Sequence, residues 1–230
     1  MTRVAVIVPA HDEQSLLPAC LSALRAAAAP VNARLIVVAD ACTDDTALVA
    51  AAGGADVVTI EERNVGRARA AGVEQALRGG AYWLATTDAD SRVPPNWLHW
   101  QLDHARTGAD LVAGTVEVDD WSGWPGPLPS RYERLYRELV AGVRHGHIHG
   151  ANLGFRASAY RAAGGFPELP RDEDRGLVAR VRASGGRVVT DAGCPVRTSA
   201  RPDGRAPHGF AAHLHGLASD SLALDSRTAR

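Results

Sequence analysis

Short apolar runs separated by amphipathic stretches fill the first half of the chain. The runs are rich in β-branched residues and have the length of buried strands. They lie at 4–8, 35–38, 57–60 and 82–86. Between the first two runs, Leu17, Cys20, Leu21 and Leu24 have the spacing of one helix face. Alternating strands and helices predict an α/β fold, with a mostly parallel central sheet flanked by helices on both faces.

The other elements follow from the same two periods and from turn residues. We expect helices at 43–52, 66–77, 95–106, 132–143 and 174–183. Thr43 is the expected N-cap of the first of these helices. We expect strands at 111–118 and near Val188, and a loop at 121–129, where Gly, Pro and Trp are frequent. The tail 220–230 is polar, and we expect it to be frayed.

Composition narrows the class of protein. Hydrophobic residues make up 46% of the 230 positions and charged residues 22%, as in ordinary globular proteins. Lys and Arg number 25 against 26 Asp and Glu, so there is no basic excess of the kind that nucleic-acid binding requires. No apolar run reaches the roughly 20 residues of a membrane span. The three cysteines, Cys20, Cys42 and Cys194, fit neither a disulfide framework nor a zinc motif, and predict a reducing, cytoplasmic location.

Acidic residues follow three of the four apolar runs. Glu13 comes after the first run, Asp40 after the second, and Asp88 and Asp90 after the fourth. Ligands of parallel sheets gather at the carboxyl ends of the strands, where these side chains should lie. Carboxylate oxygens are the ligands that Mg²⁺ and Mn²⁺ prefer. The Asp-x-Asp pair therefore predicts a metal site, the alternative being that both residues only cap the following turn.

Glycine-rich phosphate loops are missing from the sequence. No Gly-x-Gly-x-x-Gly follows the first run, and no Gly-Lys-Ser/Thr loop occurs. A bound diphosphate would therefore be held by a metal ion and by side chains.

Six motifs in chain order resemble the signatures of family 2 glycosyltransferases with the GT-A fold. They are Val-Ile-Val-Pro-Ala-His-Asp-Glu at 6–13, Val-Ala-Asp-Ala-Cys-Thr-Asp-Asp-Thr at 38–46, Asn-Val-Gly-Arg-Ala-Arg-Ala-Ala-Gly at 64–72, Asp-Ala-Asp at 88–90, Gly-Ala-Asn at 150–152 with Phe-Arg at 155–156 and Gly-Gly-Phe at 164–166, and Glu-Asp at 173–174. The resemblance covers residues 4–199. It implies one GT-A domain at 1–219, with a nucleotide-sugar half at 1–110 and an acceptor half at 111–219.

The resemblance also implies roles for residues of the donor half. Pro9, Ala10, Glu13 and Asp40 would line the nucleotide pocket, where Asp40 would accept a hydrogen bond from a base N–H. Arg67 or Arg69 would lie beside the nucleotide, and Asp88 would reach the ribose or a metal-bound water. Asp90 would be a ligand of Mn²⁺ or Mg²⁺. His208, late in the chain, would be a further metal ligand.

The resemblance also implies roles for residues of the acceptor half of the chain. The resemblance implies Asp174 as the general base that deprotonates the acceptor, with Glu173 in reserve. The acceptor would meet Gly150, Ala151 and Asn152, with His149 and Trp124 nearby.

Several of these residues have simpler explanations. Acids in a first helical turn favour the helix dipole, so Glu173 and Asp174 could serve only as caps. The alternate residues His145, His147 and His149 would share one face of a strand, either as acceptor contacts, as metal ligands or as a polar face. Trp124 could pack in a core, and His208 could lie in a surface loop.

Departures from the family pattern limit what the resemblance implies. Ala39 replaces the first of two acids, and Ala41-Cys42 replaces the usual Gly-Ser. The Gln-x-x-Arg-Trp motif of processive synthases is absent. We therefore expect metal-dependent, inverting transfer of a single sugar from a nucleotide-diphosphate donor, with UDP favoured, to an unidentified small-molecule, glycan or lipid acceptor. The alternatives are a sugar nucleotidyltransferase and a non-catalytic nucleotide-sugar-binding subunit, and a homodimer is left open.

Overall fold

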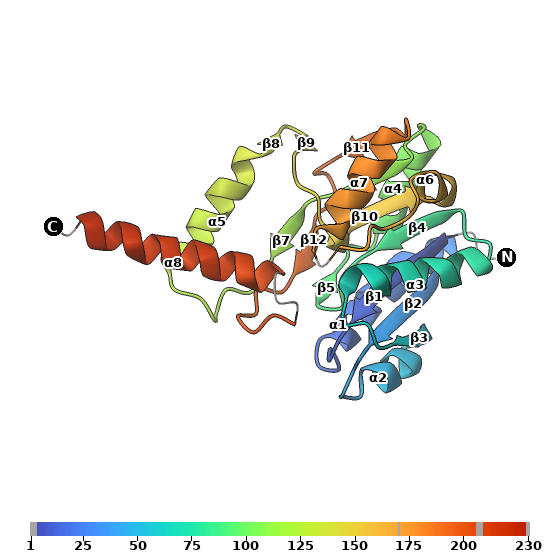
Figure 1. Cartoon of the computed structure of the whole chain (residues 1–230), viewed down its shortest axis with the longest axis horizontal. Coiled ribbons are helices and arrows are strands. Elements are labelled where there is room, and N and C mark those ends of the chain that lie inside the picture. The colour runs from blue at the N-terminus through green and yellow to red at the C-terminus, as the bar shows by residue number, and fades with distance from the viewer. Residues whose placement is uncertain (1–3, 170, 206–208, 229–230) are drawn as a thin grey trace.

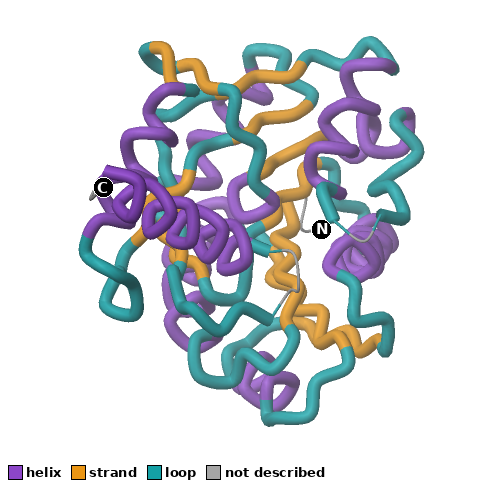
Figure 2. The backbone as a smooth tube through the Cα atoms, turned by 60° about the vertical axis from the view of Figure 1, so that its left-hand side comes forward, coloured by secondary structure: helices purple, strands orange, loops and turns teal. Residues whose placement is uncertain are grey.

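A seven-stranded sheet forms the middle layer of the protein, with helices on both faces (Figures 1 and 2). The computed structural model describes residues 4–169, 171–205 and 209–228. In spatial order the strands are β11 (Val188–Thr190), β6 (Leu111–Ala113), β10 (Leu153–Arg156), β4 (Trp83–Thr86), β1 (Val4–Ala10), β2 (Arg34–Asp40) and β3 (Asp56–Ile60). All neighbouring pairs are parallel except those of β10. The predicted α/β fold with a mostly parallel sheet is confirmed.

Alternation of side chains along β1 builds two hydrophobic cores. Val4, Val6 and Val8 face one core, which includes residues of α1 (Leu17–Ala28) and α4 (Trp97–Arg106). Ala5 and Ile7 face the other core, on the opposite side of the sheet. Its helices are α3 (Val65–Arg78), α6 (Ala157–Ala162) and α7 (Glu173–Ala183). Every β1 residue is buried, as expected for a strand covered on both faces.

Strand β10 brings the second half of the chain into the sheet. It lies between β4 and β6 and is antiparallel to both, with Leu153 opposite Thr86. The start of β10 therefore lies at the carboxyl end of β4. A hydrogen bond from Thr86 Oγ1 to Gly150 O, 2.7 Å long, ties the segment before β10 to that end.

Smaller elements surround the main sheet. They include two 3₁₀ turns, η1 (Ala29–Val31) and η2 (Gly150–Asn152), and three helices, α2 (Thr46–Ala52), α5 (Pro127–Glu138) and α8 (Phe210–Thr228). A second sheet has three strands in the order β5 (Ser91–Arg92), β12 (Val196–Thr198) and β7 (Val116–Val118). Strands β8 (Val140–Ala141) and β9 (Arg144–His145) form a hairpin. Helices α5 and α8 lie together to one side of the main sheet (Figure 1), around a third apolar cluster that contains Leu128, Tyr132 and Leu214. Among the described residues, no helix has both the length and the apolar character needed to cross a bilayer.

The prediction of one strand at 111–118 is wrong. The chain forms β6 and then β7, which belong to different sheets, with a break at Gly114 and Thr115. A Cβ at Gly114 would collide with the amide of Asn152, and Asn152 Nδ2 donates to Thr115 O at 2.8 Å. This contact between distant segments turns the chain out of the main sheet.

Three helix boundaries also differ from the sequence prediction. Helix α2 begins at Thr46 with Asp45 in the N-cap position, so Thr43 lies before the helix, where its N–H donates to Asp12 Oδ1 at 2.6 Å. Helix α5 ends at Glu138, before a hairpin turn in which Gly142 has φ of +63°, a conformation that suits glycine. Helix α8 spans Phe210–Thr228 and so includes residues 220–228 of the polar tail, where Leu and Ala at 222–224 favour a helix.

Because α3 packs closely on the sheet, we predict that replacing a glycine of α3 by alanine destabilises the protein, whereas the same change in α8 does not. A Cβ at Gly72 would overlap Ile7 Cγ2 and lie 3.0 Å from Val38 Cγ2, whereas at Gly216 of α8 nothing lies within 4 Å. We expect Gly72→Ala to lower the free energy of unfolding by about 1–3 kcal/mol, because the core must expand. Gly216→Ala, the matched control, should raise it by up to about 1 kcal/mol through helix propensity. Urea unfolding of both variants measures the difference, and equal effects would contradict the packing argument.

Candidate active site

The carboxyl ends of β1, β2 and β4 and the start of β10 meet at one edge of the main sheet. This edge carries most of the residues that the sequence nominated. Asp88 and Asp90 follow β4, Glu13 follows β1, and Asp174 lies in the first turn of α7. Two groups of ion pairs organise the edge, one around Arg69 and one around Arg201.

Arg69 is the buried cation of the first group, with 3% of its surface exposed. Its Nη2 lies 2.5 Å from Asp88 Oδ1, and its Nη1 donates to Glu173 Oε1. Burial alone would lower the pKa of Arg69, but the charges of Asp88 and Glu173 raise it overall. Arg69 Nε has no hydrogen-bond partner within the described part of the chain. A buried, unpaired N–H at this position is a donor that a ligand can use.

Gly150 fits against the same guanidinium. A Cβ at this position would overlap the terminal atoms of Arg69. The predicted acceptor segment 150–152 therefore lies directly against the Arg69 group. Glycine is required at residue 150 for this approach.

The two candidate catalytic acids are held in different ways. Glu173 is 4% exposed, and its carboxylate is occupied by Arg69. Burial raises the pKa of Glu173, and the charge of Arg69 opposes that rise. Asp174 is partly exposed, and its Oδ2 accepts the N–H of Gly150 at 2.8 Å. Asp174 is thus the acid that is both accessible and aimed at the Gly150 segment.

The second group joins Glu13 and Asp90 through Arg201. Arg201 Nη1 donates to Glu13 Oε2 at 2.7 Å, its Nη2 contacts Glu13 Oε1, and Nη2 lies 3.4 Å from Asp90 Oδ2. Burial raises the pKa of Asp90 to about 7, the charge of Asp88 adds to the rise, and Arg201 opposes it. Asp90 is therefore a half-buried carboxylate in an acidic surrounding that a cation stabilises.

The residues at this edge fit a divalent cation. Asp88 and Asp90 supply the oxygen ligands that Mg²⁺ and Mn²⁺ prefer. Arg201 already supplies positive charge beside Asp90 and stands in for such an ion. His208, nominated as a further ligand, lies outside the described residues.

The residues nominated for the nucleotide pocket lie at or just after the ends of β1 and β2. Pro9 and Ala10 end β1, beside Val38 and Ala39 of β2. Asp40 is 4% exposed, and its carboxylate accepts the backbone N–H groups of residues 62, 63 and 64 at 2.7–2.8 Å. Asp40 thus shapes the loop that leads into α3. The carboxylate that was expected to accept a hydrogen bond from a base N–H thus already accepts three backbone N–H groups.

Arg67 and Arg69, the two arginines nominated for the nucleotide, lie in different surroundings. Arg67 forms an exposed ion pair with Glu168, at 3.0 Å between Nη2 and Oε2. Arg69 lies inside the site. Their spacing of two residues places them on different sides of α3.

The histidine row is packed rather than solvated. The ring of His147 stacks on that of Tyr136, with centroids 3.6 Å apart and an angle of 5°. His145 Nε2 lies 3.0 Å from Ala113 O, and His147 Nε2 lies 2.7 Å from Tyr136 O. Carbonyl oxygens only accept, so these nitrogens carry protons and are not available as metal ligands.

His149 makes a different hydrogen bond. The N–H of Val116 donates to the Tyr136 hydroxyl at 2.9 Å, and that hydroxyl lies 3.0 Å from His149 Nε2. Burial, followed by the charges of His147 and Arg175, lowers the pKa of His149 to about 3. His149 is therefore neutral at physiological pH, with its Nε2 hydrogen-bonded to the Tyr136 hydroxyl.

Two nominated acceptor residues have structural contacts instead. Asn152 is fully buried, its Oδ1 accepts from Trp97 Nε1 at 2.8 Å, and its Nδ2 donates to two carbonyls. Trp124 Nε1 donates to Ala200 O, and its ring packs 4.6 Å from that of His215. Asn152 positions the acceptor segment, and Trp124 anchors the segment that carries Arg201. Ala151 is likewise buried, at 5% exposure.

Sequence reasoning linked Arg201, the cation of the second group, only to phosphates and missed its partners Glu13 and Asp90. It follows β12, which pairs with β5 directly after Asp90, and Ser91 Oγ donates to Thr198 Oγ1 at 2.9 Å. The stretch 198–201 carries an arginine suited to phosphate, which was the signal available in the sequence. Its partners lie far away in the chain, so spacing alone did not identify them.

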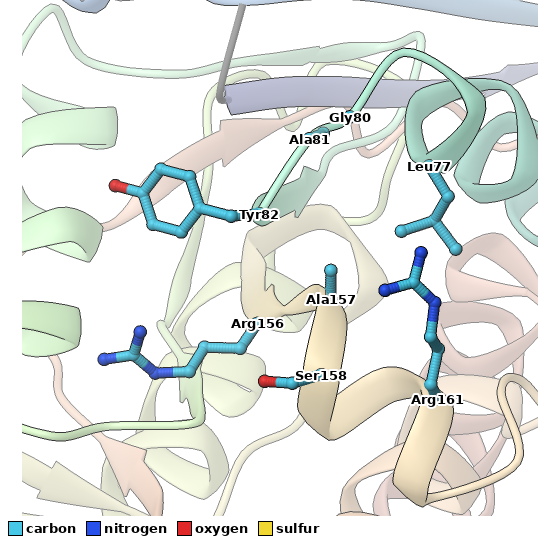
Figure 3. Close-up of a pocket in the computed structure, with 8 residues that line it drawn as sticks. All are labelled: Leu77, Gly80, Ala81, Tyr82, Arg156, Ala157, Ser158 and Arg161. Atoms are coloured by element: carbon cyan, nitrogen blue, oxygen red, sulfur yellow. The ribbon is translucent and has the colours of Figure 1, made fainter.

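A surface pocket of about 390 Å³ lies at the opposite edge of the sheet. Its lining comes from the α3–β4 connection and from the β10–α6 junction, including Tyr82, Arg156 and Arg161 (Figure 3). Arg156 donates to the carbonyls of Ala105 and Ala109 and is engaged within the protein. Because this pocket lies at the amino end of β4, it is separate from the candidate active site.

Comparison with solved structures places the fold in the GT-A class of glycosyltransferases. S. aureus TarS in complex with UDP-GlcNAc has a TM-score of 0.70 at 15% identity, covering 90% of this chain and 61% of TarS. The mannosyltransferase PcManGT from Pyrobaculum calidifontis, in complex with GDP-Man and Mn²⁺, has a TM-score of 0.67 at 19% identity, covering 98% of this chain and 75% of PcManGT.

Sequence comparison then gives the family. Residues 5–163 match the family model described as glycosyl transferase family 2, and the chain belongs to that family. An uncharacterized glycosyltransferase of Mycobacterium tuberculosis is 36% identical over 122 residues, 53% of this chain and 52% of the relative. The polyprenol monophosphomannose synthase of Mycolicibacterium smegmatis is 30% identical over 167 residues, 67% of this chain and 61% of the relative. The chain thus spans about half the length of the M. tuberculosis relative it matches.

The buried His149 predicts a pH dependence of stability. Its pKa is about 3 in the folded protein against 6.5 when unperturbed, so below pH 6.5 the unfolded chain takes up a proton that the folded protein refuses. Stability should therefore fall as pH falls, by up to about 1.4 kcal/mol per pH unit from this group. We expect His149→Gln to lose less unfolding free energy than the wild type between pH 7 and 5. His99→Gln, at a histidine that is likewise half-buried, is the control, and parallel pH profiles for all three proteins would refute the assignment.

Proposed function

We propose that this chain is a glycosyltransferase that moves one sugar from a nucleotide-diphosphate donor to an acceptor hydroxyl or phosphate. The observation that carries the proposal is the meeting of two carboxylate–arginine groups with Asp174 at one sheet edge. The acidic group suits a divalent cation, and the arginines suit a diphosphate. Asp174 supplies a base on the acceptor side.

Asp90 and Asp88 are the residues proposed to hold Mn²⁺ or Mg²⁺. The ion, when bound, would offset the charge that develops on the departing diphosphate. Arg201 would release Asp90 and turn to the phosphate oxygens, for which guanidinium geometry is well matched. Arg69 would remain in place, since both of its terminal nitrogens are engaged by Glu173 and Asp88.

Asp174 is proposed as the general base for a hydroxyl acceptor. Its Oδ2 is fixed by Gly150 N–H, which orients the second lone pair of that oxygen toward an incoming hydroxyl. Removal of a proton by a positioned carboxylate typically contributes about 10²–10⁴-fold in rate. Direct displacement from the face opposite the diphosphate would invert the anomeric centre.

We propose a chemical class for the donor and for the acceptor rather than one compound. UDP-sugars are the favoured donors, and the solved relatives in complex with UDP-GlcNAc and GDP-Man support uracil and guanine as the bases to test. The name of the polyprenol monophosphomannose synthase supports a lipid among the acceptor classes. If the acceptor is a lipid phosphate, it is already ionised, and Asp174 would orient it through bound water or a neighbouring hydroxyl rather than deprotonate it.

Calorimetry with UDP and GDP, with and without Mn²⁺, tests the donor site. We expect binding of one of these nucleotides to tighten by at least about tenfold when Mn²⁺ is present, because the ion bridges carboxylates and phosphates. Asp90→Ala should lose that gain, whereas Asp103→Ala on the exposed face of α4 should keep it. If Asp90→Ala keeps the full Mn²⁺ effect, Asp90 is not a metal ligand.

Asp174→Asn separates catalysis from binding. We expect nucleotide affinity to stay within about twofold and transfer or donor hydrolysis to fall by about 10²–10⁴-fold. Asp172→Asn is the matched control, since Asp172 is exposed and has φ of +58°, which asparagine tolerates. Full turnover by Asp174→Asn would exclude the base assignment. Pyrophosphate release from a nucleoside triphosphate would favour a nucleotidyltransferase, and binding without any turnover a non-catalytic subunit.

A further inference from the structure

Three side chains of different chemistry converge beside the nucleotide end of the site. They are His11 and Asp12, in the turn after β1, and Cys42, in the turn after β2. One ligand atom from each, a ring nitrogen, a carboxylate oxygen and a sulfur, lies within 4.8 Å of the others. All three residues are half-buried, so the cluster is open to solvent. No role in the proposed transfer reaction involves these side chains.

The tautomer of His11 leaves one nitrogen free for a ligand. Its Nδ1 lies 2.7 Å from Asp40 O. A carbonyl oxygen only accepts, so Nδ1 carries the proton and Nε2 keeps its lone pair. Nε2 is directed toward Asp12, 3.9 Å from Oδ2. A histidine whose second nitrogen donates to a carbonyl is the usual arrangement of a metal-ligating imidazole.

Asp12 is held in place as an anion. Its Oδ1 accepts the N–H groups of Thr43, at 2.6 Å, and Asp44, at 3.3 Å. The backbone hydrogen bond from Thr43 is the main cause that lowers the pKa of Asp12. The backbone donors orient the carboxylate, and Oδ2 faces His11.

Cys42 completes the set with a soft ligand. Its thiol donates to Ala10 O at 3.4 Å and is accessible, unlike the buried Cys20 and Cys194. Asp12 and Ala41, the residue before Cys42, have φ of +52° and +49°, which is costly for residues other than glycine. These two strained turns bring the three side chains together. Cys42 also stands where the family pattern has serine, so the sulfur is a feature of this chain.

We propose that His11 Nε2, Asp12 Oδ2 and Cys42 Sγ form a three-ligand site for Zn²⁺. A set of nitrogen, oxygen and sulfur ligands suits Zn²⁺, whereas the all-carboxylate pair Asp88 and Asp90 suits Mg²⁺ or Mn²⁺. On binding, the Cys42 S–H bond breaks, a Zn–S bond forms, and the proton passes to solvent. The fourth position of the tetrahedron stays open to water.

Zinc at this site should compete with the nucleotide. The ligand residues follow Ala10 and flank Asp40, which line the proposed nucleotide pocket. A nucleotide base and a hydrated Zn²⁺ would therefore need the same space. This second consequence rests on the proposed function, whereas the zinc site itself does not.

Co²⁺ is the probe that reports the sulfur ligand directly. We expect one Co²⁺ per chain to give a thiolate-to-metal charge-transfer band in the near ultraviolet, together with visible bands of a tetrahedral ion, and Zn²⁺ to abolish both. Cys42→Ser should lose the charge-transfer band, and His11→Gln should weaken binding by at least about tenfold. Cys194→Ser, at a buried thiol, is the matched control and should keep the wild-type spectrum.

Two results would overturn the zinc site. One is the lack of a charge-transfer band in the wild type. The other is a band that persists in Cys42→Ser and Cys42→Ala. Circular dichroism of each variant checks that it is folded.

Competition between Zn²⁺ and UDP tests the zinc site separately from the proposed glycosyltransferase function. We expect equimolar Zn²⁺ to weaken binding of UDP with Mn²⁺ by at least about tenfold in the wild type and by less than twofold in Cys42→Ser. Simultaneous full binding of Zn²⁺ and UDP would overturn the competition. A Cys42-dependent Co²⁺ band in a protein that binds no nucleotide would leave the zinc site standing and reject the proposed function.

Discussion

The buried guanidinium of Arg69, held between Asp88 and Glu173, is the contact on which the candidate site depends. It joins helix α3, the end of β4 and the start of α7 in one set of charge-assisted hydrogen bonds. Charges this far from water must be paired, and removal of one partner of a buried pair typically costs about 3–5 kcal/mol. The Arg69 group therefore stabilises the fold and fixes the position of Asp174, which follows Glu173 directly.

The second cation, Arg201, has a different character. It is partly exposed, belongs to a segment after β12, and contacts Glu13 and Asp90 from outside the main sheet. Contacts of Thr198 and Ala200 are among those that tie this segment down near the site. One arginine is thus locked into the sheet edge and the other is partly exposed, and the proposed binding and release of a nucleotide diphosphate would require a cation of each kind.

Sequence patterns predicted the elements of the first half well, because they depend on local periodicity. The apolar runs at β1 to β4 and the acids that follow them needed no knowledge of distant residues. The errors arose where a distant contact decides the outcome. Asn152 bends the chain at Gly114, Asp12 captures the N–H of Thr43 away from α2, and Arg201 meets Glu13 across nearly the whole chain. For the same reason, motif spacing did not reveal the hydrogen bonds that Asn152 and Trp124 form within the protein.

The antiparallel strand β10 has a consequence for the synthesis of this chain on the ribosome. Strand β4 is complete long before β10 emerges, and until then one side of β4 has no partner for its N–H and C=O groups. Unpaired edges of apolar strands are prone to pair with other chains. The first half is therefore a poor candidate for an autonomous folding unit, and nascent protein would remain vulnerable to aggregation until the segment around residue 156 leaves the exit tunnel.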